Sequence, residues 1–263
     1  MPVMQIKVDN QNIFYYILFM NEEDLQTNSR DYLVSILKSL VGAIPYAGTL
    51  ASEIIGNSIP KQRMDRIANY LIELSNRVET LENNHLKWLE DLKQSKSNLL
   101  IFELAVKYAL ETNSQIMYNS YASVVFNAVK NNDQESIINE KILRSISELS
   151  GEEIIWLIWF SEPVVLFGET QFYKKFSDIL KPHSRSTGNS EKDRLHNALQ
   201  DQYILNLYGK GLLYRKNAGV AKGTLSISSG DKAPELKDFS ITPYGKIVVN
   251  ALYNEEFFGK NTK

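Results

Sequence analysis

The sequence predicts a mainly α protein: a helical bundle with one long heptad-patterned helix and a C-terminal winged-helix-like subdomain with a small β-hairpin. Three observations predict this fold. Between Met64 and Leu92, apolar residues recur in alternating steps of three and four, which is the seam of a helix with a period of 3.5 residues. Capping signals for successive helices follow between residues 112 and 153. Near the C-terminus, short β-rich segments lie between two helical segments, in the order of a winged helix.

Two different segments precede the long helix. Residues 1–20 hold two β-rich runs, which predicts a β-hairpin; the alternative is an extension upstream of the natural start. Residues 39–52 (SLVGAIPYAGTLAS) carry no charge, and Pro45 and Gly48 divide this apolar region, residues 33–59, into a hairpin of two helices. The fourteen uncharged residues are fewer than the roughly twenty that span a bilayer, so a buried hairpin is favoured. The alternative is a membrane or partner contact through Leu40, Val41, Ala43, Ile44, Ala47 and Leu50.

The long helix is expected to run without interruption from Met64 to Leu92, with Pro60 in its first turn. Such a helix of about thirty residues would be roughly 45 Å long, so it should pack against several helices or a second chain. An intramolecular bundle is favoured over a dimeric coiled coil. His85 interrupts the seam as a tolerated polar residue. The expected association seam consists of Met64, Ile67, Leu71, Leu74, Val78, Leu81 and Trp88.

Four helices are expected after it: one at residues 97–112, one capped by Thr112 and running to about Lys130, and two at 132–149 and 150–161. Their starts are predicted by the capping-box patterns Thr112-x-x-Gln115, Asn132-x-x-Glu135 and Ser150-x-x-Glu153. Pro163 prevents continuation of the last one.

The C-terminal region has signals for short strands as well as for helices. A short helix at 168–180 precedes a polar loop, and Ser190-x-x-Asp193 caps a helix that ends before Gly209-Lys210-Gly211. Short strands are expected at 212–215, 220–228 and 236–241, followed by a last helix at 242–252. The apolar side of the helix from Ser190 is interpreted as ordinary core and consists of Leu195, Leu199, Tyr203 and Leu207.

The resulting domain organisation has four parts. These are the N-terminal hairpin or extension (1–20), a helical domain with the apolar hairpin and long helix (21–132), a helical to winged-helix-like domain (133–258) and a tail (259–263).

Composition excludes several kinds of chemistry. The chain has no cysteine, which rules out disulfides, cysteine nucleophiles and Cys-ligated metal centres. Its three histidines, His85, His183 and His196, lack the spacing of a zinc-protease helix. The N-terminal region has no basic stretch typical of a signal peptide, so a cytoplasmic protein is expected. No catalytic, cofactor-binding or metal-binding residues are predicted.

Two charged clusters have structural interpretations. Asp231, Glu235 and Lys237 resemble the carboxylates and lysine of metal-dependent nucleases, but their spacing is compressed and a charged wing loop is favoured. Glu152 and Glu153 are adjacent carboxylates at a helix start, where capping and the helix dipole explain them.

DNA binding is a further alternative, because a winged helix can place a helix in the major groove. The positive charge available to it is modest. The basic residues of the expected wing are Arg215, Lys216, Lys222, Lys232 and Lys237. Asp231, Glu235 and Asp238 oppose them, so little counterion release is expected.

Four stretches together resemble a known family. They are ALETNSQIMYNSYASVVFNAV from Ala109, ILRSISELSGEEIIWLI from Ile142, LNLYGKGLL from Leu205 and ITPYGKIVVNAL from Ile241. In this order they resemble bacterial hypothetical proteins of the Abi-alpha type, which are linked to phage abortive infection. Thr242, Pro243 and Gly245 match the family's turn before its last helix, and Leu205, Leu207 and Gly211 match a helix end. The resemblance covers residues 35–253 and implies a defence context, with no site residues to carry over.

The sequence therefore favours a non-enzymatic protein that acts by helix-mediated protein association, in antiphage (abortive infection) defence. Its expected partner is itself, as a homo-oligomer, or another protein. The alternatives are a membrane-perturbing effector that uses residues 33–59 and a winged-helix DNA-binding regulator.

Overall fold

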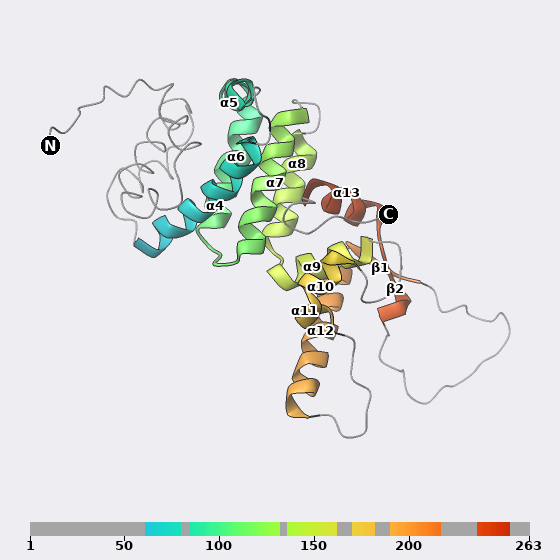
Figure 1. The fold of residues 1–263 in the computed structure, drawn as a ribbon. Coiled ribbons are helices and arrows are strands. Elements are labelled where there is room, and N and C mark those ends of the chain that lie inside the picture. The colour runs from blue at the N-terminus through green and yellow to red at the C-terminus, as the bar shows by residue number, and fades with distance from the viewer. Residues whose placement is uncertain are drawn as a thin grey trace. The chain divides into compact units, whose positions relative to one another are not determined.

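The fold is mainly α-helical, as the sequence predicts (Figure 1). A computed structural model describes residues 61–79, 81, 85–131, 136–161, 170–181, 190–216 and 236–252. These residues form ten α-helices, one 3-10 helix and two short strands. The chain divides into two compact units, Met1–Glu148 and Leu149–Lys263. The hairpin or extension expected at 1–20, the apolar segment at 33–59 with its six contact residues, and the tail at 259–263 lie outside the described residues.

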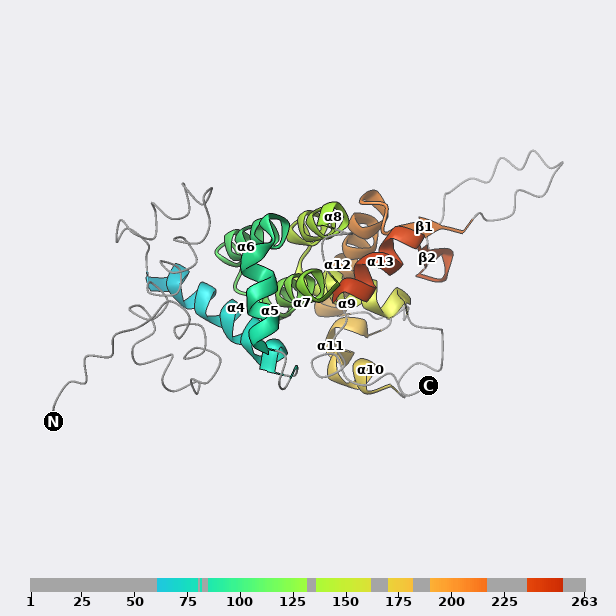
Figure 2. The same ribbon diagram turned by 90° about the horizontal axis from the view of Figure 1, so that it is seen from above.

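The first unit is a helical bundle centred on α7. Its helices are α4 (Lys61–Glu79), α5 (His85–Gln94), α6 (Lys96–Ala109), α7 (Gln115–Asn131) and α8 (Ser136–Ser147). Helix α7 contacts each of the other four (Figure 2). It is accordingly buried around most of its circumference, including Tyr118, Tyr121, Ala122 and Val125. An apolar helix of this kind, hydrophobic on all sides, is expected at the centre of a core.

The structure corrects the single long helix predicted from Met64 to Leu92, because the segment forms two helices, α4 and α5. Leu81 lies in a turn, where its N–H donates to Val78 O at 3.0 Å. Figure 1 shows α5 almost along its axis and α4 from the side, so the two axes differ in direction. The sequence between the two helices includes Asn83 and Asn84, and asparagine is a residue type that disfavours a helix interior.

The boundary between the units also differs from the expected one. The sequence places it after residue 132, whereas the structure groups α8 with the first unit. Helix α8 packs on α6 and α7 through Ile142, Leu143 and Ile146, which are buried. The division therefore falls just before α9, at Leu149.

The second unit is built around α9 (Gly151–Ser161). Its other elements are α10 (Gln171–Lys175), α11 (Ser177–Leu180), α12 (Glu191–Gly209), β1 (Leu213–Arg215), η2 (Leu236–Asp238), β2 (Phe239–Ile241) and α13 (Pro243–Leu252). Helix α9 contacts α11, α12, α13 and β2. Strands β1 and β2 pair antiparallel, with Leu213 opposite Ile241. The expected small sheet is therefore present, while the strand expected at 220–228 lies outside the described residues.

Two helix starts predicted in this unit are confirmed by capping boxes in the structure. Ser150 and Glu153 form a reciprocal capping box, and so do Ser190 and Asp193. Gly211 adopts a φ of 70° just after α12, a left-handed conformation that glycine tolerates best. The helix expected at 168–180 is divided into α10 and α11 at Phe176.

One predicted cap is wrong. Thr112 does not cap α7, because its Oγ1 accepts from the N–H of Ser114, two residues on, and α7 begins only at Gln115. This local turn is a common use of a threonine hydroxyl. The corresponding pattern at Asn132 lies outside the described residues.

Candidate functional site

The predicted association seam is buried by the chain's own helices. Ile67, Leu71, Leu74 and Val78 of α4 are almost fully buried, and α4 packs on α7 and α6. Trp88 of α5 is also buried, and its Nε1 donates to Phe126 O at 3.3 Å. Met64 lies in α4, and Leu81 is half-buried in the turn after it. The seam therefore serves the intramolecular bundle and offers a second chain little apolar surface.

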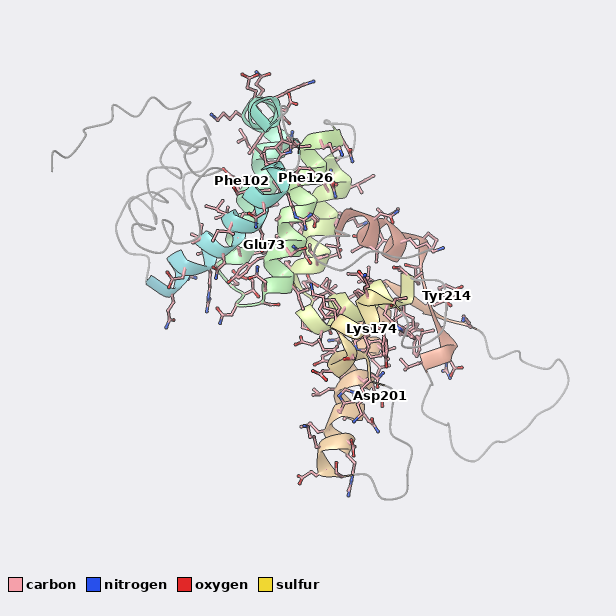
Figure 3. All side chains as sticks on the ribbon, viewed as in Figure 1. Glu73, Phe102, Phe126, Lys174, Asp201 and Tyr214 are labelled. Atoms are coloured by element: carbon pink, nitrogen blue, oxygen red, sulfur yellow. The ribbon has the colours of Figure 1, made fainter. Side chains whose placement is uncertain are left out.

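A polar cluster accompanies this packing between α4 and α7. The buried amide of Asn119 donates from Nδ2 to Glu73 Oε2 at 2.8 Å and accepts at Oδ1 from Arg77 at 2.7 Å. Gln115 Nε2 donates to Glu73 Oε1 at 2.5 Å at the exposed end of the cluster. Glu73 points from α4 toward α7 in Figure 3. Sequence reasoning missed this cluster, because only a knowledge of which helices pair brings these residues together.

Two titratable groups of the first unit are perturbed by burial alone. Burial raises the pKa of the Tyr70 hydroxyl and that of the Glu103 carboxyl. Tyr70 OH and Glu103 Oε1 are buried and have no hydrogen-bond partner within the described part of the chain. The Tyr70 ring lies 6.4 Å from that of Phe102. Neither group has the charged partner that an acid–base pair would provide.

In the second unit, Glu153 joins two helices. Its Oε2 accepts from Ser150 N at 2.7 Å within the capping box, and its Oε1 accepts from Asn206 Nδ2 of α12 at 2.7 Å. The pKa of Tyr203 is raised, mainly by burial and also by the charges of Glu152 and Glu153. Glu153 is buried, so these hydrogen bonds satisfy a carboxylate that would otherwise be costly.

The exposed face of α12 departs most from expectation. Leu195 and Leu199, interpreted from sequence as core, are 61% and 44% exposed, and Leu205 is 47% exposed. Gln200, Ile204 and Leu207 are the residues of α12 that are buried. The core interpretation is therefore correct for Leu207 and wrong for Leu195 and Leu199. Figure 1 shows the first turns of α12 extending past α10 and α11.

These exposed residues share one side of the helix. At about 100° per residue, Leu195, Ala198, Leu199 and Leu205 fall within roughly 120° of the circumference. Ile204 and Leu207 lie on the opposite side. Helix α12 is thus apolar on two faces, one packed within its unit and one open. The open side, with Leu195, Ala198, Leu199, Gln202 and Leu205, is named the α12 face.

Charged residues border the α12 face. Arg194 and Asp201, seven residues apart, lie on the same edge of it. Asp201 is marked on α12 in Figure 3. Asp193 lies on the packed side, where hydrogen bonds from the side chain and backbone of Ser190 lower its pKa and Lys181 Nζ lies 3.6 Å from Oδ1. The edge of the α12 face thus carries a positive charge at Arg194 and a negative charge at Asp201.

The described residues contain no group of three or more His, Asp or Glu side chains that could hold a metal ion. His196 Nε2 lies 3.2 Å from Lys181 O, and Lys237 belongs to η2. His183, Asp231 and Glu235 lie outside the described residues. None of the helices described has both the length and the apolar character needed to cross a membrane.

Comparison of the chain with protein-family models, with curated proteins and with solved structures finds no match.

Proposed function

We propose that this chain is a non-enzymatic protein that acts by helix-mediated protein association, and that the α12 face is its association surface. The resemblance to Abi-alpha proteins suggests antiphage defence as the setting. One observation carries the proposal: three leucines remain 44–61% exposed on a single side of a helix whose other side is packed.

Exposure of this kind is informative because Leu195 and Leu199, four residues apart, are neighbours on the helix surface, with Ala198 beside them. Single apolar residues are common on protein surfaces, whereas a grouped apolar patch usually marks an interaction site. Covering such surface contributes roughly 25 cal/mol for each Å² removed from water. A partner that lays an apolar helix along the first turns of α12 would gain this contribution, while Asn206, farther along the same side, keeps its hydrogen bond to Glu153 of α9.

The predicted seam is a weaker candidate for the same role. Its residues in α4 and α5 already fill the core of the first unit. Their release to a partner would require α4 to leave α7, together with the Glu73, Arg77 and Asn119 hydrogen bonds. Association by helices is therefore attributed to α12.

The proposal is tested by photo-crosslinking in cells. A photoreactive amino acid is placed at Leu195 or at Leu199, and as control at Ile247 of α13, an apolar residue outside α12 that is 47% exposed. We expect discrete protein adducts from both α12 positions and none from the control. Absence of adducts from α12, in a chain whose circular dichroism shows it folded, would overturn the proposal.

DNA binding is a second candidate, favoured by the consecutive exposure of Tyr214, Arg215 and Lys216 at the end of β1. Cationic and aromatic side chains at a strand end suit contact with phosphates and bases. Titration of a fluorescent random duplex at low salt tests it, and no binding there would exclude it.

A further inference from the structure

We infer that the partner of the α12 face is a second copy of this chain, with the two α12 helices packed antiparallel about a two-fold axis between Leu195 and Ala198. This inference rests on the proposed function, because it names the occupant of the same surface. It is carried by the order of apolar and charged residues along α12.

The α12 face has the spacing of a short coiled-coil seam. Leu195 and Gln202 lie seven residues apart at one seam position, and Ala198 and Leu205 lie seven apart at the other. All four are exposed. The first half of this seam, with Leu195 and Ala198, belongs to the turns of α12 that extend past α10 and α11 (Figure 1). Leu195 and Ala198 are exposed there, so a second helix can reach them.

The charges at the edge select the direction and register of pairing. Arg194 and Asp201 each stand one residue before a seam residue, so they occupy equivalent positions on one edge. In an antiparallel pair, each edge of one helix runs along the same edge of the other. Placing Leu195 against Ala198 of the second copy brings Arg194 beside Asp201 of the second copy, and symmetry repeats this ion pair. The alternation on this edge therefore fits the antiparallel arrangement.

Other arrangements lack this complementarity. In a parallel pair, Arg194 would meet Leu199 and Asp201 would meet Asn206. In an antiparallel pair that slides to place Leu195 against Leu205, the two copies of Asp201 would face each other across the axis. Like charges in such a contact repel, which disfavours this register.

The opposite edge of the seam is mixed at the same register. Leu199, which is 44% exposed, lies beside Lys192 of the second copy, whose aliphatic stem can pack on it. The paired stretch then runs from residue 191 to 202 of each copy, which is about three turns or roughly 18 Å. At its ends Glu191 faces Gln202 of the second copy, where an amide N–H can donate to the carboxylate.

Both charged groups are able to make the edge contact. Arg194 is exposed and Asp201 is half-buried. A carboxylate has lone pairs for several donors, so Asp201 can accept from a guanidinium while it keeps other interactions. Exposed ion pairs contribute little affinity, so the Arg194–Asp201 pairs are expected to set direction and register, while the leucines provide most of the attraction.

The dimer should be reversible. A single helix pair buries less than the roughly 1,200–2,000 Å² typical of stable interfaces. We therefore expect dissociation on dilution through the micromolar range. The packed side of α12, with Ile204 and Leu207, is not involved, so each copy keeps its fold.

Sedimentation velocity of the full chain across about 1–200 μM tests the dimer and its direction. The variants are Arg194→Asp, Asp201→Arg, the double exchange Arg194→Asp/Asp201→Arg, and Leu195→Glu. Lys246→Asp is the matched control, because this exposed charge lies on α13. We expect a wild-type dimer, at least about tenfold weaker dimerisation in each single exchange and in Leu195→Glu, and recovery in the double exchange.

A second measurement does not depend on charge reversal. Because the chain lacks cysteine, Leu195→Cys and Ala198→Cys each introduce a single thiol. Oxidation of a mixture should form mainly the mixed disulfide, since these two positions face each other in the antiparallel register. A parallel pair would instead crosslink each variant with itself.

The outcomes separate the two proposals. A dimer with recovery in the double exchange and a predominant mixed disulfide supports the antiparallel pair. A strict monomer, a dimer insensitive to Leu195→Glu, or failure of the double exchange to recover overturns it. A monomer that still gives α12 adducts with a different protein in the cellular crosslinking keeps the proposed function and excludes only the second copy.

Discussion

Arg77 of α4 donates from one guanidinium nitrogen to both the side-chain oxygen and the main-chain oxygen of Asn119 in α7, at 2.7 and 3.3 Å. The amide nitrogen of the same asparagine donates to Glu73, one turn earlier on α4. A single buried amide thus receives and donates hydrogen bonds with two oppositely charged side chains. This arrangement fixes how far α4 can slide along α7, because apolar contacts alone tolerate several registers.

Asn119→Ala should lower the free energy of unfolding by about 2 kcal/mol, since it leaves Glu73 and Arg77 without their shared partner. Urea denaturation measures the change. Gln115→Ala is the matched control, because it removes the exposed end of the same cluster and should cost less than about 1 kcal/mol. Equal losses in the two variants would contradict the role attributed to the buried amide.

Gly245→Ala should destabilise the second unit by about 1–3 kcal/mol through overpacking. A Cβ at Gly245 would overlap Leu212 O and lie 2.8 Å from Ile241 Cγ1. Gly209→Ala is the control, because no atom lies within 4 Å of the position that its methyl group would take, and alanine favours the helix by up to about 1 kcal/mol. Thermal unfolding should therefore show opposite shifts, and a stabilised Gly245→Ala would refute the steric argument.

Glu153→Ala should cost about 2–3 kcal/mol, because it removes one half of the capping box at α9 and leaves the Asn206 amide without its acceptor. The neighbouring Glu152→Ala is the control. Glu152 also lies in the first turn of α9, so its loss should cost less than about 1 kcal/mol through the helix dipole. Chemical denaturation followed by circular dichroism compares them, and a larger loss for Glu152→Ala would count against the capping role of Glu153.

The free energy of unfolding of the Glu103→Gln variant should increase relative to that of the wild type as the pH rises. Burial raises the pKa of Glu103 in the folded state, so the folded state binds its proton more tightly than the unfolded state. The stability from this protonation is present below the unfolded pKa and is lost as the pH rises through the folded pKa. Unfolding free energies measured from about pH 4 to pH 7 test the trend, and Glu90→Gln, at an exposed glutamate of α5, controls for the loss of one charge. A constant difference between Glu103→Gln and wild type would contradict it.

The sequence predicts those elements whose signals are local. Ser150 with Glu153 and Ser190 with Asp193 mark helix starts through contacts three residues apart, and the structure contains both capping boxes. Gly211 marks a helix end because its positive φ is a property of the residue itself. The apolar spacing of Ile67, Leu71, Leu74 and Val78 likewise predicts which side of α4 is buried.

The other features of the structure depend on tertiary contacts, which the spacing of residues in the sequence does not specify. The seam continues in register from Val78 to Trp88, so its period does not indicate the turn at Leu81. Leu195 and Leu199 have the spacing of a core stripe, yet α12 packs through Ile204 and Leu207. A helix with apolar residues on two sides can leave one of these sides exposed, and this pattern is present in the sequence. The Asn119 cluster requires the pairing of α4 with α7.

The hydrogen bonds between α4 and α7 join residues 42 to 46 positions apart in the chain. During translation at roughly 5–20 residues per second, the apolar side of α4 therefore leaves the ribosome several seconds before α7 can cover it. In that interval the nascent polypeptide presents Ile67, Leu74 and Val78 to chaperones. Slow codons between residues 80 and 115 would lengthen this exposure, and a chaperone that captures nascent chains should be recruited there.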